Sequence, residues 1–239
     1  KMQNTIWKSL AISQTGPRHI RKNLPNQDAV IAKKFVWGEV ISVSDGVGSR
    51  SLSQIGSAQA CVATIKLAQY LSNSVIIHSK QQILYLFHAY WLSLLDSHNI
   101  EDCATTCLFA TRINQKIYIA MLGDGLITIL RKDKRIQFIE QHDLNAFANM
   151  TCSLNEKFNM DQWNFLIIDS HDVNMICLCT DGISEDIQIS QRENFFRDLY
   201  DVYKLQTIRE IKCDIRKWLK NWGVKNHQDD KSIAILMKV

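Results

Sequence analysis

The sequence predicts an α+β domain in which helices cover antiparallel β-sheets. Three strand-like runs stand near the start, two segments with helical periodicity follow them, and a series of short strands comes next. A further helical region and a closing strand complete the chain. Strands and helices that come in separate groups, and do not alternate singly, are typical of layered α+β domains.

The first third of the chain contains the early strands and both periodic helices. A strand is expected at 3–13, a polar, turn-rich loop at 14–28, and a strand pair at 29–34 and 36–44. The segment "SLSQIGSAQACVATIKLAQYLS" then has apolar residues at helical spacing, and "SKQQILYLFHAYWLSLLDSH" repeats that pattern more strongly. Two successive helices are therefore predicted.

The remaining elements are read from apolar runs and turn signals. Strands are expected at 104–113, 116–122, 125–130, 136–140, 175–180 and 232–239, with a helical region at 191–221. The basic cluster "RKDKR" lies between two of these strands and is interpreted as a solvated hairpin tip. Residues 142–172 are expected to be irregular, and this segment is our candidate for the surface that selects substrates.

Composition limits the classes of protein to which the chain can belong. Its 239 residues, 46% of them hydrophobic, suit one domain spanning residues 1–239. A net charge of +4 requires neither a nucleic-acid nor a membrane partner, so we expect neither, and we expect a monomer. No apolar run reaches the roughly 20 residues that span a bilayer, and no cleavable signal pattern is seen. The seven cysteines lie mostly in apolar runs, which indicates reduced core thiols and a cytoplasmic location.

Three strand-like runs each end on one aspartate. "VISVSDGVGS" presents Asp45 before a glycine, "IYIAMLGDG" presents Asp124, and "MICLCTDG" presents Asp181. The sheet behind a strand end holds such a carboxylate in place, and a following glycine allows a sharp turn. A single Asp-Gly pair is usually only a turn, but three of them favour a cation site.

Two more acidic motifs precede strands, "NQDA" at 26–29 and "QDDKS" at 228–232. Aspartate oxygens are the ligands that hard divalent cations prefer, and histidine or cysteine ligands are almost absent from this set. The pattern therefore predicts Mg²⁺ or Mn²⁺ in preference to zinc.

The ordered motifs resemble a known family. "QDA", "SDGVGS", "ATTCLFATRINQKIYIAMLGDG", "CTDGISED" and "DDKSIAILMKV" are similar, in that order, to the metal-dependent type-2C serine/threonine protein phosphatases, and in particular to a bacterial branch. The resemblance implies a four-layer αββα sandwich, with two central antiparallel β-sheets flanked by helices. It places the metal ions at one end of the sandwich.

The resemblance also implies a role for each acidic position. Asp45 matches the aspartate that bridges two metal ions, Gly46 the glycine whose carbonyl joins the second ion, and Asp28 the early ligand of that ion. Asp181 and Asp229 match the two aspartates that complete the first ion. These four aspartates are the expected catalytic set.

Asp124 matches an aspartate linked to a third, more weakly held ion. Asp229 is aligned in preference to Asp230 because the family pattern is aspartate, a polar residue, any residue, and then threonine or serine. Many members place an arginine ahead of the early ligand to bind phosphate, but here that spacing falls on Asn23. Arg18, Arg21, Lys22 and His19 are the candidates to bind phosphate instead, and His19 is also a candidate acid for the leaving group.

The activity implied is hydrolysis of phosphomonoesters on phosphorylated proteins, opposing a serine/threonine kinase. Two Mn²⁺ or Mg²⁺ ions would activate a bridging hydroxide that attacks phosphorus, and a third ion is the further possibility. Two alternatives stay open. One is a catalytically inactive module that uses the same fold for binding or regulation, and the other is a hydrolase of small phosphoesters.

Overall fold

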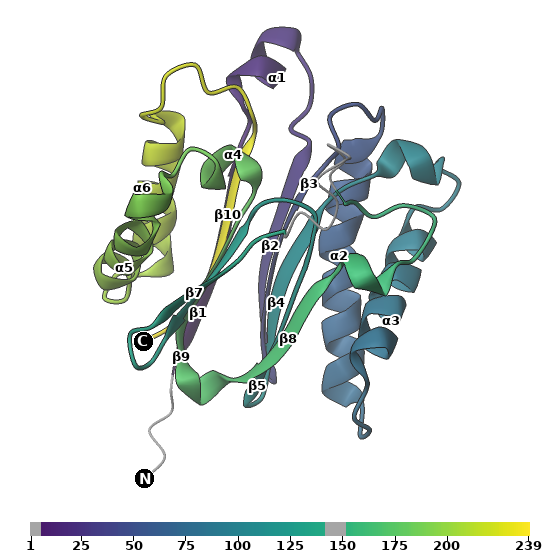
Figure 1. Ribbon diagram of the computed structural model, residues 1–239, viewed down its shortest axis with the longest axis horizontal. Helices are drawn as coiled ribbons and strands as arrows, with labels where there is room; N and C mark the ends of the chain where they lie inside the picture. Colours follow the sequence, from purple (N-terminus) through teal and green to yellow (C-terminus); the bar gives the residue numbers. More distant parts are fainter. Residues whose placement is uncertain (1–5, 142–151) are drawn as a thin grey trace.

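In a computed structural model that describes residues 6–141 and 152–239, the chain forms two five-stranded sheets between two layers of helices (Figure 1). The strands are β1 (Trp7–Gln14), β2 (Asp28–Phe35), β3 (Gly38–Asp45), β4 (Cys107–Ile113), β5 (Lys116–Leu122), β6 (Leu126–Arg131), β7 (Ile136–Ile139), β8 (Asn164–Asp169), β9 (Val173–Cys179) and β10 (Lys231–Lys238). The helices are α1 (Pro17–Lys22), α2 (Ser53–Asn73), α3 (Lys80–Leu94), α4 (Asp181–Ser184), α5 (Arg192–Tyr203) and α6 (Ile208–Lys220).

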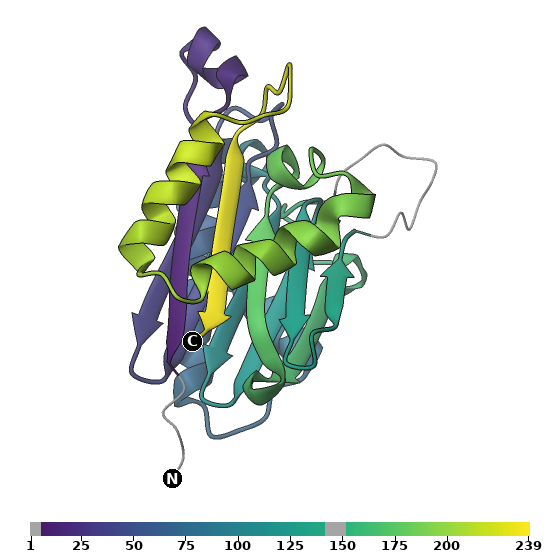
Figure 2. The same cartoon turned by 90° about the vertical axis from the view of Figure 1, so that its left-hand side faces the viewer.

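Every strand pairing in the described chain is antiparallel. One sheet has the order β1-β10-β9-β6-β7 and the other β2-β3-β4-β5-β8. Helices α5 and α6 cover the first sheet, and α2 and α3 cover the second (Figures 1 and 2). The predicted αββα sandwich is therefore confirmed.

Three apolar clusters hold these layers together, one under each helix pair and one between the sheets. Strand β3 shows why the sequence alternates as it does. Ile41 and Val43 point between the sheets, while the Ser42 hydroxyl donates to the carbonyl of Leu108 at 3.0 Å. A strand buried on both faces must satisfy its polar groups internally, and Ser42 does so within the sheet, whereas the buried hydroxyl of Ser44 has no hydrogen-bond partner among the described residues.

The helices begin where local side chains satisfy their free amides. Ser79 accepts from the amide of Gln82, whose own side chain accepts from the amide of Ser79, and Thr207 and Glu210 repeat this capping box at α6. Ile211 is the first buried residue of α6 and begins its apolar face.

The structure corrects two sequence-based expectations. The loop predicted at 14–28 contains α1, which begins at Pro17, because proline has the backbone angle of a first helical residue. The segment 142–172 was expected to be irregular, yet it contains β8, which pairs with β5 at the sheet edge. The helical region predicted at 191–221 is confirmed, and it consists of α5 and α6. Residues 142–151 of the predicted substrate-selecting surface lie outside the described residues.

Other expectations concern single side chains. The "RKDKR" cluster is the tip between β6 and β7, and Arg135 is exposed there, as predicted. All seven cysteines are free thiols. No helix in the described part of the chain has the length and apolar character needed to cross a bilayer.

Strand order brings the acidic motifs to one end of the sandwich. Asp28 and Asp45 are direct partners in the β2–β3 pair, and Asp181 follows β9 just as Asp229 and Asp230 precede β10. Because β9 and β10 run antiparallel, the end of one strand and the start of the other lie at the same edge.

Candidate functional site

A cavity of about 270 Å³ opens at this end of the sandwich, and we call it the strand-end cavity. Its lining comes from six separate parts of the chain: Arg18, His19, Leu24, Gln27, Asp28, Asp45, Gly46, Val47, Gly48, Thr106, Asp124, Asp181, Asp229 and Asp230. All five aspartates predicted from the sequence as metal ligands, and Gly46 with them, thus line one space.

Asp28 connects the two sheets. Its Oδ2 accepts hydrogen bonds from the hydroxyls of Ser232 at 2.6 Å and Thr180 at 3.0 Å, both from the opposite sheet edge. Its exposed fraction is only 8%. Neither hydroxyl was singled out from the sequence, although Thr180 stands directly before the Asp181 motif and Ser232 closes "DDKS".

Two threonines directly before β4 hold the backbone of Asp45 in place. The Asp45 amide donates to Thr106 Oγ1 at 2.9 Å, and Thr105 Oγ1 donates to the Asp45 carbonyl at 2.8 Å. The next residue, Gly46, lies so close to its neighbours that a Cβ would stand 2.8 Å from the Gln27 carbonyl oxygen. Only glycine fits there without displacing the strand end.

Burial disfavours the ionised form of these carboxylates when no cation is bound to them. Burial, with a smaller contribution from the charge of Asp230, raises the pKa of Asp28 to about 7. Burial and the charges of Asp28 and Asp181 raise the pKa of Asp45 well above its usual value. Burial and the charge of Asp124 raise the pKa of Asp181 to about 6. A bound cation would remove this penalty, since it favours the ionised form of each carboxylate.

The donor chemistry therefore fits a hard divalent cation. Within residues 6–141 and 152–239, however, no group of three His, Cys, Asp or Glu side chains already meets the spacing of a metal site. The set matches a cation by the type of its oxygen ligands and by the burial that raises the pKa values of Asp28 and Asp45.

The candidate phosphate-binding residues lie on or beside α1. Arg18 lines the strand-end cavity, and its amide donates to the Gln228 carbonyl at 3.1 Å. Arg21 is not among the lining residues, and its guanidinium donates to the side chain of Gln228. Asn23, at the spacing where the family has arginine, closes α1 in the left-handed conformation (φ 52°). Asparagine tolerates that conformation better than most residues, which gives Asn23 a structural role here.

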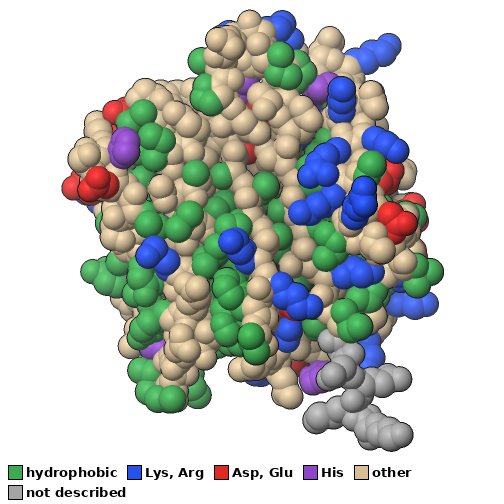
Figure 3. All heavy atoms as spheres, turned by 180° about the vertical axis from the view of Figure 1, so that it is seen from behind, with side chains coloured by type: hydrophobic (Ala, Val, Ile, Leu, Met, Phe, Trp, Pro, Cys, Tyr) green, Lys and Arg blue, Asp and Glu red, His purple; other side chains and the backbone are tan. Residues whose placement is uncertain are grey.

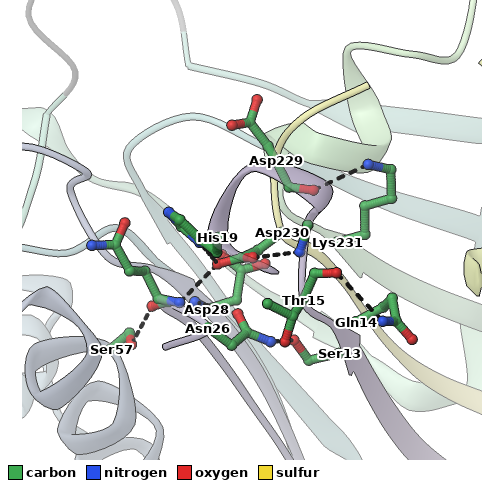
Figure 4. A network of polar contacts seen from close by, with 12 residues as sticks. Ser13, Gln14, Thr15, His19, Asn26, Asp28, Ser57, Asp229, Asp230 and Lys231 are labelled. Atoms are coloured by element: carbon green, nitrogen blue, oxygen red, sulfur yellow. Dashed lines mark hydrogen bonds and ion pairs between the residues drawn. The ribbon is translucent and has the colours of Figure 1, made fainter. Parts of the chain in front are cut away.

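Asp230 is the functional-site residue that sequence reasoning passed over. It is 5% exposed and accepts hydrogen bonds from the amides of Gly16 and Gln27, each at 2.7 Å. It also pairs with His19 Nδ1 at 2.8 Å (Figure 4). Its place directly after the aligned Asp229 was the signal available in the sequence.

A larger hollow of about 690 Å³ lies at the β6–β7 tip, and we call it the hairpin hollow. It is lined by Arg131, Lys132, Asp133, Arg135, Ile136, Gln137 and Asp172. Asp133 accepts from the amide and the guanidinium of Arg135, at 3.0 and 2.7 Å. These two contacts give each carboxylate oxygen of Asp133 a donor within the hairpin. None of the predicted site residues lines the hairpin hollow.

Comparisons with known proteins agree with this geometry. A family model described as Protein phosphatase 2C matches residues 15–222. No curated protein matches the sequence.

Solved structures of bacterial phosphatases share the fold. The catalytic domain of the serine/threonine phosphatase PstP with two manganese ions matches with a TM-score of 0.68 at 14% identity, over 99% of this chain and 100% of that one. Stp1 from Staphylococcus aureus matches with a TM-score of 0.66 at 14% identity, over 98% and 95% of the two chains. PstP/Ppp from Mycobacterium tuberculosis matches with a TM-score of 0.63 at 13% identity, over 97% and 98%.

Proposed function

Because the chain belongs to the protein phosphatase 2C family, we propose that it is a metal-dependent phosphatase acting on phosphoserine and phosphothreonine in proteins. The observation that supports this most directly is the strand-end cavity. It gathers buried carboxylates from both sheets, with pKa values raised by burial and by one another.

The same carboxylates are the proposed ligands of two Mn²⁺ or Mg²⁺ ions, with Asp124 reserved for a third. The ligand set is Asp28, Asp45, Asp181, Asp229 and the carbonyl of Gly46. When bound, such ions lower the pKa of a coordinated water and offset the negative charge of a phosphoryl group.

The chain's own groups would then orient ligands and substrate. The hydroxyls of Thr180 and Ser232 fix one oxygen of Asp28. Thr106 holds the backbone at Asp45. Arg18, on the cavity wall, is the proposed cation for the phosphate oxygens, since a guanidinium can bind them through two parallel hydrogen bonds.

We also propose the wider setting expected from the sequence. The chain would act as a single domain over residues 1–239, as a monomer in the cytoplasm, and would reverse the action of a serine/threonine kinase. The metal in the cell would be manganese or magnesium.

Phosphate release from phosphoserine and phosphothreonine peptides, measured with and without Mn²⁺, tests the proposal. We expect turnover that needs the metal and that falls by about 10³-fold or more in Asp45→Asn, since a ligand to both proposed ions is lost. Asp133→Asn removes a carboxylate of the hairpin hollow and should leave the rate unchanged, so it is the matched control.

Two results would replace the proposal with an alternative. Wild-type protein that hydrolyses neither the peptides nor p-nitrophenyl phosphate in Mn²⁺ would indicate a binding or regulatory module. Faster turnover of small phosphoesters than of phosphopeptides would indicate a small-phosphoester hydrolase. Undiminished turnover by Asp45→Asn would show that metal ions bound at Asp45 take no part in the reaction.

A further inference from the structure

Helix α6 presents a row of basic side chains to solvent. Arg209, Lys212, Arg216 and Lys220 follow one another at intervals of three and four residues, so they lie along one flank of the helix. Three of them are exposed and Lys212 is half-buried, while the apolar face of the helix packs on the sheet that contains β1. We call these four residues the α6 stripe. Figure 3 shows Lys and Arg side chains gathered on this side of the molecule.

The cations of the α6 stripe have no acidic partner in the described part of the chain, because none of the ion pairs there includes one of them. The two acidic residues of the same helix make other contacts. Glu210 accepts from the amide and the hydroxyl of Thr207 at 2.8 and 2.7 Å, and Asp214 accepts from the Tyr203 hydroxyl at 2.6 Å. The carboxylates of α6 thus support the fold and do not pair with the stripe.

This arrangement of charge opposes the stability of the helix. Like charges three or four residues apart repel one another, and every neighbouring pair in the α6 stripe has that spacing. Arg209 also stands in the first turn of α6, where the positive end of the helix dipole disfavours a cation. Alternation of the two signs along this flank would serve solubility without that repulsion. The stripe therefore indicates a role in binding an anionic partner.

The α6 stripe leads toward the strand-end cavity. Helix α6 ends at the site end of the sandwich, and the loop after it passes beside α1 into β10 (Figures 1 and 2). The backbone carbonyl of Gln228 in this loop accepts from the amide of Arg18 at 3.1 Å, and its side chain accepts from the guanidinium of Arg21. Asp229, which lines the cavity, follows Lys220 by nine residues, so the two lie no more than about 30 Å apart.

We propose that the α6 stripe docks an acidic segment of the phosphoprotein whose phosphate enters the strand-end cavity. This inference depends on the phosphatase activity proposed above and adds a class of substrate to it. Charge complementarity identifies the occupant as a run of Glu or Asp, and continuity with the cavity favours a segment of the substrate over a separate nucleic acid or lipid surface. The stripe is about 16 Å long by the helical rise, a length that about five extended residues match.

Paired phosphoserine peptides test this docking. One carries five glutamates about ten extended residues from the phosphoserine, and its partner carries five glutamines there. Both are made with the run on either side, since either chain direction fits. In Mn²⁺ and about 50 mM NaCl, we expect wild-type kcat/KM to be about 10-fold higher for the better glutamate peptide, because a second contact on the same chain is intramolecular.

The origin of this preference can be separated by kinetics. The gain should lie in KM and leave kcat unchanged, because the docking contact is the same before and during the reaction. It should largely disappear at about 500 mM NaCl, where salt screens exposed charges. A role of the stripe in the fold alone would produce neither dependence.

A variant that removes the charge of the α6 stripe should lose the preference and keep wild-type turnover of the glutamine peptide. Its melting temperature should not fall, because the change removes repulsion within the helix. The four substitutions are Arg209→Gln, Lys212→Gln, Arg216→Gln and Lys220→Gln. A matched control removes four exposed cations elsewhere and should keep the preference, through Lys66→Gln, Lys116→Gln, Lys132→Gln and Arg135→Gln.

Two further measurements address direct contact. The double variant Arg216→Glu/Lys220→Glu should turn over a peptide with five lysines in the same positions faster than wild type does, since the charges are then complementary. Fluorescence anisotropy of the unphosphorylated glutamate peptide measures docking without turnover. The wild type should bind this peptide, and the variant without stripe charge should not.

The outcomes are distinct from those of the proposed function. Equal wild-type kcat/KM for the glutamate and glutamine peptides, or an equal loss of preference in the matched control, would overturn the inference. Tighter binding of duplex DNA or phosphatidylserine vesicles than of the glutamate peptide, lost with the stripe charge, would assign the stripe to another partner and overturn it as well. Wild-type protein that binds the unphosphorylated peptide but releases no phosphate would defeat the phosphatase proposal and retain the docking surface.

Discussion

The strand-end cavity and the hairpin hollow both contain aspartates, but their carboxylates are in opposite states. At the exposed hairpin, the amide and guanidinium of Arg135 donate to Asp133 and hold its pKa below the usual value. In the strand-end cavity, burial raises the pKa of Asp28 to about 7, and the side chains of Thr180 and Ser232 that donate to it are neutral hydroxyls. The charge of Asp133 is offset by Arg135 in its own turn, which indicates a structural role. The buried aspartates of the strand-end cavity lie together with raised pKa values, which indicates a site for a bound cation.

Charged side chains are also unevenly distributed on the rear face of the molecule. Lys and Arg side chains gather on the α5–α6 side of the rear face, while few acidic side chains are visible across that face (Figure 3). Two of the aspartates that line the strand-end cavity, Asp28 and Asp230, are buried, which is uncommon for carboxylates because burial removes them from water.

Metal binding should show the largest difference between the two regions. At saturating Mn²⁺ we expect the melting temperature of the wild type to rise by roughly 5–10 °C, because a ligand bound only by the folded state stabilises it. Asp45→Asn should lose most of this rise, and Asp133→Asn should keep it. Differential scanning fluorimetry measures all three, and equal shifts in the two variants would contradict the comparison.

The pH dependence of stability should differ next. The pKa of Asp28 is raised above its unfolded value of 3.8, to about 7. Folded protein without metal therefore binds more protons than unfolded protein in that interval, so this group's stabilisation is complete below pH 4 and is lost as pH rises toward 7.

Urea unfolding of metal-free protein at several pH values measures this effect. The variant Asp28→Asn should have a flatter profile between pH 4 and 7, since its amide does not ionise. Asp133→Asn should retain the wild-type fall. An unaltered slope in Asp28→Asn would show that burial does not oppose ionisation at this position.

Close packing at the site end gives a smaller prediction. A Cβ at Gly16 would stand 2.3 Å from the Asp229 backbone, whereas at Gly223 it would meet nothing within 4 Å. We expect Gly16→Ala to reduce the free energy of unfolding by about 1–3 kcal/mol, since a backbone must shift. Gly223→Ala should change it by less than about 0.5 kcal/mol. Chemical denaturation of both variants would decide, and equal losses would count against a tight join at α1.

The smallest effect belongs to the hairpin itself. Arg135→Ala removes the guanidinium contact with Asp133 and keeps the backbone amide contact, and such exposed ion pairs contribute little because water screens them. Neither the melting temperature nor phosphate release should differ measurably from wild type. A clear loss of turnover would give the hairpin hollow a role in the reaction.

Much of the fold was predictable because its signals are local. The periodic apolar positions of α2 and α3 and the alternating runs of the central strands depend on neighbours in sequence. The edge strand β8 was missed because edge strands are only partly buried and their pattern is weak. Helix α1 was missed because six residues give too short a period to recognise, and none of them is buried.

The residues of the candidate site also fall into those with a local sequence signal and those without one. Asp45 and Asp181 were found because each ends an apolar run, which a single sequence records. The contacts of Asp230 with Gly16 and His19 join positions more than 200 residues apart. No local pattern encodes such a join, so only the folded chain reveals it.

The position of β10 has a consequence for synthesis of the protein on the ribosome. This strand follows all the other strands in the sequence, yet it lies between β1 and β9 inside its sheet, and the turn before it supplies Asp229 and Asp230. Strand β1 therefore has no partner in this sheet until β10 has emerged from the ribosome. A product that ends before this turn would lack an inner strand of the sheet together with Asp229 and Asp230.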